Sequence, residues 1–243
     1  MSFAGKTYWL VGASEGLGRA VARQLAKEGA VLRLSARGAE RLESLAAEVG
    51  NGATAHPLDI QKRDDVQRVA SEIGAIDGVI FAAGVYWPMR AKDWDPEQVE
   101  LMCDINFTGA ARVLGTVVPE MVKRDAGHVV IIGSLSGFRG LPGAIGYGAS
   151  KAGVMHLAEN LQAELRGSGV KVQLVNPGFI KTRLTDKNDF KMPFVMEADQ
   201  AATHVLAAMR SERFQSNFPR VFSWLFRAGN FLPAWLYYRI FGA

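Results

Sequence analysis

A glycine-rich turn directly after the first strand-like run constrains this chain more than any other feature. Residues 7–11 are apolar and rich in strand formers, and residues 12–18 read Gly-Ala-Ser-Glu-Gly-Leu-Gly. This GxxxGxG spacing lets the backbone turn tightly into a helix, whose first amides and positive dipole end can bind a phosphate group. It differs from the GxxxxGK[ST] loop, so ATP or GTP hydrolysis is disfavoured. The alternative is an ordinary turn, but the position after an N-terminal strand favours phosphate binding.

The chain alternates strand-like and helix-like segments up to about residue 180. Apolar runs lie at 7–11, 30–35, 78–82, 128–133 and 170–175, separated by amphipathic or mixed segments near 17–28, 39–49, 61–73, 96–124 and 147–166. Continuous apolar runs are typical of strands buried on both faces. We therefore expect an α/β, Rossmann-like fold: a doubly wound parallel sheet of about seven strands with helices on both sides. The sequence has no repeat or linker, so we expect one domain over 1–243, with 212–243 as its aromatic and basic C-terminal extension.

Charge and cysteine content disfavour several classes of protein. The net charge is +4, but residues 210–243 hold five Arg and one Glu, so the rest of the chain balances at 23 basic and 23 acidic side chains. A neutral body predicts no nucleic-acid binding. The single cysteine excludes an internal disulfide, and the four histidines show no metal-ligand spacing. We expect no metal site, no room for a signal peptide, no membrane-spanning stretch and a cytoplasmic location.

The end of the second strand-like run bears on cofactor choice. In dinucleotide-binding folds this point faces the adenosine ribose, where an acid binds the 2′-hydroxyl and an Arg accommodates a 2′-phosphate. Here residues 34–37 read Leu-Ser-Ala-Arg, without an acid. Ser35 and Arg37 therefore favour NADP(H) over NAD(H), unless Arg37 is simply a solvated loop cation. Glu15, an acid beside the phosphates, helps neither cofactor.

A phenol and an ammonium lie one helical turn apart in Tyr147-Gly-Ala-Ser-Lys151. A phenol with its ordinary pKa near 10 is a poor base at neutral pH. A nearby Lys cation and the positive ring of an oxidised nicotinamide both favour phenolate and lower that pKa. Ser134 follows the apolar run 128–133, at a strand end where open α/β sheets bind ligands. A YxxxK match is common by chance, so it predicts catalysis only in combination with the other motifs.

In combination, these motifs resemble those of the classical short-chain dehydrogenase/reductase family over roughly residues 5–185. The glycine turn, Ser134, Tyr147 and Lys151 occur in the family's order and at its spacing. Further matches are Asn106, Asp59 in Leu58-Asp59-Ile60, and Asn176-Pro177-Gly178 followed by Thr182. The chain departs from the family at Ala82-Ala83-Gly84, where the family has Asn-Ala-Gly. The missing amide should weaken the bracing of the central sheet.

The resemblance implies an NADP(H)-dependent oxidoreductase that interconverts a hydrophobic carbonyl and its alcohol. Ser134 would hold the carbonyl oxygen, Tyr147 would deliver the proton, and Lys151 would bind the nicotinamide ribose and lower the Tyr147 pKa. Asn106 would position a water that links Lys151 to solvent. The expected cofactor-binding residues are Gly12, Ser14, Glu15, Gly16, Leu17, Gly18, Ser35, Arg37, Asp59, Ile60, Ala83, Gly84, Tyr147, Lys151, Pro177, Gly178, Ile180 and Thr182. A homodimer or homotetramer through helices at 98–124 and 147–166 is also implied.

Simpler roles and other functions stay open at this point. Ser134 could cap a loop, Asn106 could distort a helix, and Asp59 could form a turn. The chain as a whole could be a cofactor-binding regulator or a membrane-surface scaffold with little catalysis. The segment 179–199 takes the place of the family's variable substrate loop, and it predicts a lid for a hydrophobic substrate. Its apolar residues, for which simple packing is the alternative, are Phe190, Met192, Phe194, Val195 and Met196.

The C-terminal extension is unusually aromatic, with ten of the 23 aromatic residues between Phe214 and Phe241. A helix over 216–228 would align Ser216, Arg220, Ser223 and Arg227 in one polar stripe, and Pro233 opens a second short segment. Neither piece can span a bilayer, but Arg mixed with aromatic residues suits a helix lying in a membrane interface. Residues 214–243 are therefore a candidate for peripheral membrane contact. Covering the core, roofing the substrate pocket and joining two subunits are the alternatives.

Overall fold

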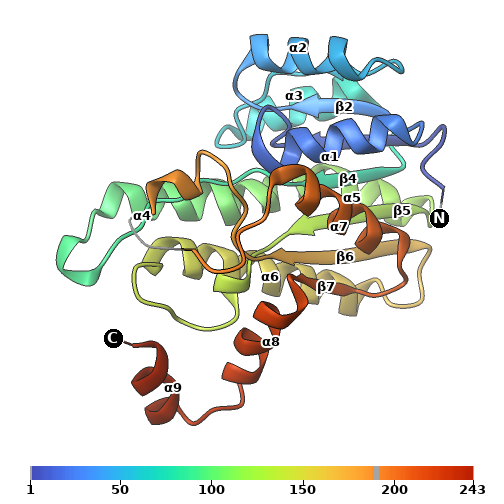
Figure 1. Cartoon of the computed structure of the whole chain (residues 1–243). Coiled ribbons are helices and arrows are strands. Elements are labelled where there is room, and N and C mark those ends of the chain that lie inside the picture. The colour runs from blue at the N-terminus through green and yellow to red at the C-terminus, as the bar shows by residue number, and fades with distance from the viewer. Residues whose placement is uncertain (1, 189–191, 243) are drawn as a thin grey trace.

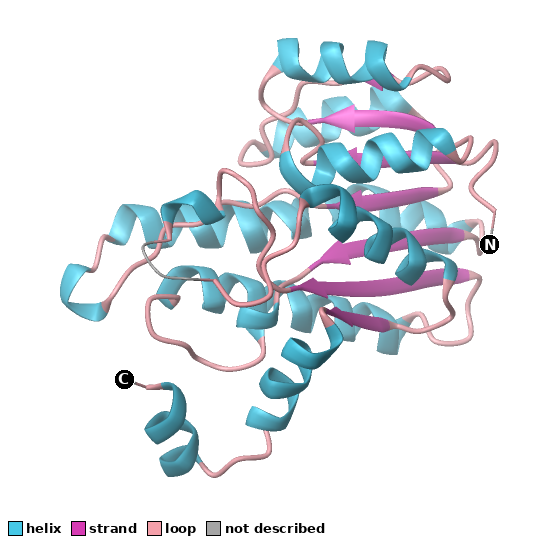
Figure 2. Ribbon diagram, viewed as in Figure 1, coloured by secondary structure: helices cyan, strands magenta, loops and turns pink. Residues whose placement is uncertain are grey.

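The computed structural model describes residues 2–188 and 192–242, and its centre is a parallel sheet in the order β3-β2-β1-β4-β5-β6-β7 (Figures 1 and 2). The strands are β1 (Thr7–Val11), β2 (Val31–Ser35), β3 (Thr54–Ala55), β4 (Gly78–Phe81), β5 (Gly127–Ile132), β6 (Val170–Pro177) and β7 (Gln215–Phe218). The α-helices are α1 (Gly16–Lys27), α2 (Ala39–Val49), α3 (Arg63–Ile73), α4 (Pro96–Cys103), α5 (Gly109–Lys123), α6 (Ile145–Glu164), α7 (Ala198–Arg210), α8 (Arg220–Gly229) and α9 (Ala234–Phe241). Short 3₁₀ turns η1 (Ala91–Asp93), η3 (Leu135–Gly137) and η4 (Thr185–Lys187) and a π-helical segment η2 (Asp104–Thr108) complete the secondary structure of the described part.

Successive residues of a strand pack alternately into two hydrophobic clusters, one on each face of the sheet. In β1, Tyr8 and Leu10 pack in the cluster that includes residues of α1, α2 and α7, whereas Trp9 and Val11 pack in the cluster that includes residues of α3, α5 and α6. Side chains alternate between faces because the strand period is two. Both faces are therefore buried, which explains the continuous apolar runs in the sequence and confirms the predicted doubly wound, Rossmann-like sheet.

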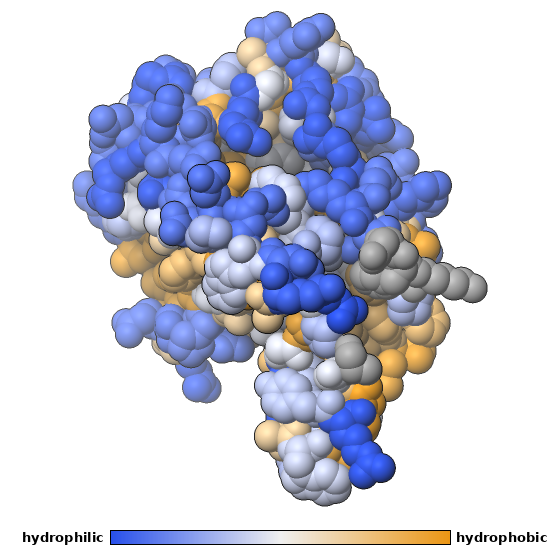
Figure 3. Space-filling model, turned by 90° about the vertical axis from the view of Figure 1, so that its left-hand side faces the viewer, coloured by the Kyte–Doolittle hydropathy of each residue, from blue (hydrophilic) through white to orange (hydrophobic). Residues whose placement is uncertain are grey.

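The strand order reverses between β1 and β4, and this reversal positions the site. From β1 the chain crosses to β2 and β3 on one side, and β4 then lies on the other side of β1. Loops leaving the carboxyl ends of β1 and β4 diverge at such a switch point, and a crevice opens between them. In Figure 2 the arrowheads converge on this edge, which faces the viewer in Figure 3.

The helix that begins with α4 runs on through η2 and α5, and by length and composition this 28-residue segment, Pro96–Lys123, could cross a membrane. Within the described residues it is the one helix that meets this test. In its most apolar stretch, 44% of the window is buried inside the fold. Met102, Val113 and Met121 of this segment lie in the core. The segment thus packs over one face of the sheet and contributes side chains to the core.

The C-terminal extension differs from the expected single helix over 216–228. Residues 215–218 form strand β7, which pairs with Leu174–Pro177 of β6. Residues expected to begin a helix therefore form the edge strand of the sheet. The helix α8 starts only at Arg220, after Pro219, and Ser223 is buried with its hydroxyl donating to the Arg220 carbonyl, 2.9 Å away. The predicted polar stripe is therefore wrong. The second segment, α9, begins after Pro233 as expected, and both helices project from the body (Figures 1 and 3).

Candidate active site

The glycine turn follows β1 and passes directly into α1. Gly12 has φ +94°, and a side chain there would place a Cβ 2.5 Å from the Ala83 nitrogen in the loop after β4. A Cβ at Gly18 would lie 2.0 Å from the Gly12 carbonyl oxygen. Only glycine permits this backbone conformation and this close packing, which bring the N-terminus of α1 over the crevice.

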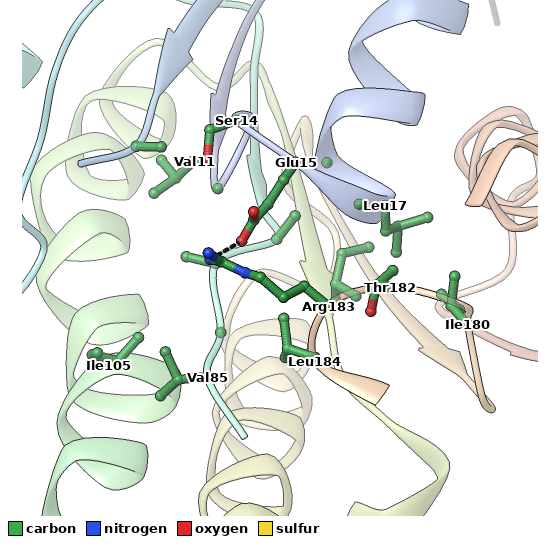
Figure 4. A pocket seen from close by; sticks show the side chains of 18 of the residues that line it. Val11, Ser14, Glu15, Leu17, Val85, Ile105, Ile180, Thr182, Arg183 and Leu184 are labelled. Carbon is green, nitrogen blue, oxygen red and sulfur yellow. Dashed lines mark hydrogen bonds and ion pairs between the residues drawn. The ribbon is translucent and has the colours of Figure 1, made fainter. Parts of the chain in front are cut away.

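A cleft of about 450 Å³ runs along the carboxyl ends of β1, β2, β4, β5 and β6. Nearly all the sequence-predicted site residues line it: Gly12, Ser14, Glu15, Gly16, Leu17, Gly18, Arg37, Asp59, Ile60, Ala83, Gly84, Ser134, Tyr147, Lys151, Pro177, Gly178, Ile180 and Thr182. Ser35 and Asn106 are the predicted residues that do not line it. Figure 4 shows the turn and the loop after β6 facing each other across this cleft.

Ser35 lies in the core instead of at the cleft. Its side chain is fully buried, and its hydroxyl accepts a hydrogen bond from the Trp9 indole at 2.9 Å. Its carbonyl oxygen accepts from the amides of Gly12 and Ala13 at 2.7 and 3.1 Å. The expectation that Ser35 contacts a cofactor therefore needs correction, because the strand period turns its side chain inward. The residue braces the glycine turn from below.

The Glu15 carboxylate forms ion pairs with two arginines that the sequence analysis did not single out. Arg41 of α2 lies 3.2 Å from one carboxylate oxygen of Glu15, and Arg183, after β6, lies 2.5 Å from the other. Both arginines line the cleft, and Figure 4 shows the Arg183 contact. This acid, which by itself is unfavourable for a phosphate ligand, is thus paired with two cations. Arg41 stands four residues after Arg37, a spacing that could have revealed it; Arg183 is 168 residues from Glu15 and could not be found from spacing.

Ser134, Tyr147 and Lys151 meet on one wall of the cleft. Ser134 follows β5, and its hydroxyl lies 2.9 Å from the Ser136 hydroxyl and accepts from the Ser136 amide at 3.2 Å. Tyr147 lies in the first turn of α6. Burial raises the pKa of its phenol above the ordinary value, and a hydrogen bond with Ser134 partly offsets this. The protein by itself therefore holds Tyr147 as a neutral phenol, contrary to the expected lowering of its pKa, which relied in part on a cofactor cation.

Lys151 stands one turn after Tyr147 on the same side of α6. Its side chain is buried, its Nζ donates to the Ile132 carbonyl at 3.0 Å, and it lies 5.8 Å from the centroid of the Tyr147 ring. Desolvation disfavours the charged form of an amine, and burial lowers the pKa of Lys151 to about 8. A buried cation beside a phenol, with a perturbed pKa and a cleft in front of it, is typical of a catalytic site.

Asn106 lies within the π-helical segment η2 and braces the loop after β4. Its Oδ1 accepts from the Val85 amide at 2.8 Å, and its Nδ2 donates to the Val85 carbonyl at 3.0 Å and to the Ser150 hydroxyl at 2.9 Å. Both amide hydrogens are therefore used by protein acceptors, and the expected role of Asn106 in positioning a water stays a prediction. The wider π turn brings the amide to the loop, where it supplies bracing beside Ala82, which lacks an amide.

The loop after β4 places two aromatic residues, Tyr86 and Trp87, near the site. The ring of Tyr86 meets that of Tyr147 edge-on at 4.9 Å between centroids, and the Tyr86 hydroxyl donates to Asn188 Oδ1 at 2.8 Å. Lys187 donates to the Tyr86 carbonyl at 2.8 Å, and its Nζ lies 4.1 Å from the centroid of the Trp87 ring. These contacts dock the loop after β6 over the site. The sequence pattern did not single out Tyr86 or Trp87.

The predicted substrate loop divides into core and exposed residues. Met196 is buried, so simple packing explains it, whereas Phe194 and Val195 are exposed. Met192 is partly buried and its sulfur accepts from Asn188 Nδ2 at 3.2 Å. Phe190 lies outside the described residues. In the described part no group of three His, Cys, Asp or Glu side chains could hold a metal ion.

A doubly wound sheet with a glycine turn at its switch point and a serine, a tyrosine and a lysine in the crevice defines a Rossmann-like oxidoreductase. A family model described as short chain dehydrogenase matches residues 6–192. An uncharacterized oxidoreductase of Myxococcus xanthus is 41% identical over 203 residues, which span 81% of this chain and 80% of that protein. This chain therefore belongs to the short-chain dehydrogenase family.

Solved structures agree with this assignment. A short-chain dehydrogenase from Sphingobium yanoikuyae in complex with NADPH is 29% identical, with a TM-score of 0.83 over 92% of each chain. A short chain dehydrogenase from Burkholderia cenocepacia in complex with NADP is 23% identical, with a TM-score of 0.88 over 99% of each chain. The second likeness shows the fold alone, and it extends over the C-terminal helices.

Proposed function

We propose that this protein is an NADP(H)-dependent oxidoreductase that interconverts a hydrophobic carbonyl compound and its primary or secondary alcohol. The observation that carries the proposal is the convergence of the Ser134 hydroxyl, the Tyr147 phenol and the Lys151 ammonium on the wall of a cleft that begins at the glycine turn. We take residues 1–243 as one dinucleotide-binding domain, of which 212–243 is an extension.

The residues of the cleft fit a nicotinamide dinucleotide. The N-terminus of α1 presents backbone amides and a positive dipole end to a pyrophosphate. Gly84 lies at the end of the cleft near Lys151. A side chain at this position would crowd that end, because its Cβ would lie 3.3 Å from Asn106 Oδ1 and 3.6 Å from Lys151 Nζ. Lys151 would donate to the nicotinamide ribose. When bound, the cofactor supplies or accepts the hydride.

The protein's own part in the reaction is to hold the substrate oxygen and to move a proton. The Ser134 hydroxyl orients the carbonyl oxygen beside Tyr147. Tyr147, which is partly buried and kept as a neutral phenol by its raised pKa, is the group that donates its proton to that oxygen in the reducing direction. The Lys151 cation, held at the Ile132 carbonyl, stabilises the phenolate that remains. Asn106 positions the loop that carries Gly84 and Val85.

Two arginines near the end of β2 support a preference for NADP(H). Arg37 and Arg41 line the cleft where an adenosine 2′-phosphate would lie, and residues 34–37 contain no acid to bind a 2′-hydroxyl. The Sphingobium yanoikuyae neighbour, 29% identical, is described as a complex with NADPH. The Tyr86 ring, which packs edge-on against Tyr147, supports an apolar substrate. We further propose a homodimer or homotetramer through the α4–α5 and α6 surfaces, where Phe107 and Val122 are exposed.

The test is NADPH oxidation, with NADH in parallel, across aliphatic, aromatic and polycyclic carbonyl compounds, using the Tyr147→Phe protein as control. General acid catalysis contributes about 10²- to 10⁴-fold, so the variant should lose at least that factor in kcat while its affinity for NADPH changes less than twofold. Equal turnover by the variant would refute the role of Tyr147. Cofactor binding without turnover on any compound would favour a regulator with this fold.

A further inference from the structure

The two C-terminal helices carry an exposed apolar surface, here called the tail surface: Val221, Trp224, Leu225, Phe231, Trp235, Tyr238 and Ile240. Each of these side chains is more than half exposed, and Phe231, between the helices, is 90% exposed. Val221, Trp224 and Leu225 follow the i, i+3, i+4 spacing and form one outward stripe of α8. Isolated exposed apolar residues are ordinary, whereas seven of them gathered on two short consecutive helices and the turn between them mark a candidate interaction site.

The other side of each helix holds the tail surface in place against the body. Phe222 of α8 packs on Phe179 and Phe194, with centroid separations of 5.8 and 5.6 Å. Tyr237 of α9 is buried and donates to the Gly140 carbonyl at 3.0 Å. The outward apolar residues are thus not an unfolded core, because each helix already buries a separate face. Phe194, next to Phe222 and itself exposed, extends the apolar surface to the substrate loop.

The charged side chains of α8 and α9 are all arginines. Arg220, Arg227 and Arg239 are exposed on α8 and α9, and no acidic side chain occurs after Glu212. Among the ion pairs between described residues, none involves these three arginines. In Figure 3 the lower lobe, formed by the C-terminal helices, is mostly pale to orange, while the upper part of the molecule is predominantly blue. Aromatic and aliphatic side chains bordered by arginines match the boundary between anionic headgroups and acyl chains.

A second copy of the chain fits the same surface poorly. A two-fold contact pairs a patch with itself, so it would bring the three arginines of one copy toward those of the other. No carboxylate of the patch could compensate them, and like charges brought together in an interface cost several kcal/mol. Helices of ten and eight residues are also too short to span a bilayer.

We propose that the tail surface binds an anionic lipid bilayer, with α8 and α9 lying in the interface plane. Trp224, Trp235 and Phe231 enter the acyl boundary, and Arg220, Arg227 and Arg239 contact the headgroups. The contact adds to the proposed oxidoreductase function and is independent of it.

The experiment is co-sedimentation of the full chain with vesicles of phosphatidylcholine alone or with 30 mol% phosphatidylglycerol. We expect strong binding to the anionic vesicles only, weakened by salt. An arginine near an anionic surface contributes about a fivefold factor in affinity, so the triple variant Arg220→Gln, Arg227→Gln, Arg239→Gln should bind roughly 100-fold more weakly. The matched control changes the same net charge elsewhere, through Arg63→Gln, Arg90→Gln and Arg166→Gln, and should bind nearly as well as the wild type.

A second pair of variants tests the apolar part. Trp224→Glu with Trp235→Glu should abolish sedimentation, whereas Trp94→Glu, at a comparably exposed tryptophan outside the tail surface, should leave it unchanged. Equal losses in the two arginine triples, or no wild-type binding, would overturn the proposal. So would a change of oligomeric state in the Trp224→Glu, Trp235→Glu protein, measured by ultracentrifugation without vesicles, because the surface would then join copies of the chain. No turnover is measured, so failure of the proposed reaction would not affect these results.

Discussion

Gly18 is the position in the glycine turn that leaves least room for a side chain. In Gly18→Ala the new Cβ would meet the Gly12 carbonyl oxygen at 2.0 Å, so the backbone of the turn must shift. Overpacking of this kind costs about 1–3 kcal/mol, and for a chain of this size we expect a fall in Tm of roughly 2–12 °C. Gly115→Ala is the control, since its Cβ would enter open space on α5, and it should stabilise by about 0.5–1 kcal/mol. Equal Tm values for the two variants would contradict this account.

Arg37 and Arg41 test cofactor choice at the residue scale. A hydrogen bond to a charged group contributes about 1.5–3 kcal/mol, so Arg37→Ala should raise the Kd for NADPH by roughly 10- to 100-fold and leave that for NADH nearly unchanged. Arg41→Ala should act in the same direction but less strongly, because Arg41 also neutralises Glu15. Calorimetric titration with both cofactors measures the effect. A parallel loss of NADH affinity would show that the arginines contact the part common to both.

At the scale of elements, a buried polar chain ties β1, β5 and β6 together. Tyr8 of β1 contacts His128 Nδ1 of β5 at 2.9 Å, and His128 Nε2 contacts Gln173 Oε1 of β6 at 2.9 Å. Gln173 Nε2 donates to the carbonyls of Ala208, Ser211 and Arg213 at 2.8–2.9 Å. Burial lowers the pKa of His128 to about 4. Three strands and the end of α7 thus depend on a neutral imidazole.

The pH dependence of stability follows from this histidine. An unfolded His has its ordinary pKa near 6.5, so between pH 6.5 and 4 the unfolded state binds more protons at this site than the folded state. Stability therefore falls as the pH falls through that window, by up to about 3 kcal/mol. Urea unfolding at pH 7 and 4.5 should show the loss in the wild type and a smaller pH difference in His128→Gln, which is less stable at pH 7. His156→Gln, at an exposed site, should behave like the wild type. If His128→Gln lost as much stability between pH 7 and 4.5 as the wild type does, His128 would not be the cause of the pH dependence.

At the scale of the whole molecule, Arg139 joins the tail to the catalytic body. Its Nη1 donates to the carbonyls of Gly229 and Leu232 at 2.5 and 2.8 Å, and its guanidinium lies 4.1 Å from the centroid of the Tyr237 ring. Arg139→Ala should release α9 while the sheet stays folded. We expect faster hydrogen exchange over residues 230–242, by at least tenfold, with Tm lowered by less than about 3 °C. Arg166→Ala serves as the control, and unchanged exchange in Arg139→Ala would exclude this anchoring role.

Local pattern alone determined much of this protein. The apolar runs predicted five of the strands and the glycine turn predicted the cleft at the start of α1, because burial on both faces and a tight turn before a helix leave direct signatures in residue type. Tyr147 and Lys151 were predictable for the same reason: one helical turn fixes their proximity. The short strands β3 and β7 carry too few residues for a pattern, and β7 exists because the edge of β6 offers hydrogen-bond partners to residues 215–218.

Tertiary structure decided what each polar side chain contacts. Ser35 and Arg37 stand two residues apart, yet one is buried against Trp9 and the other lines the cleft, since strand β2 ends between them. Glu15 pairs with Arg183 because the loop after β6 folds over the glycine turn. Asn106 binds the Val85 backbone because a π turn widens its helix. Sequence spacing fixes contacts within one turn or strand, whereas contacts between elements depend on how the sheet and its helices pack.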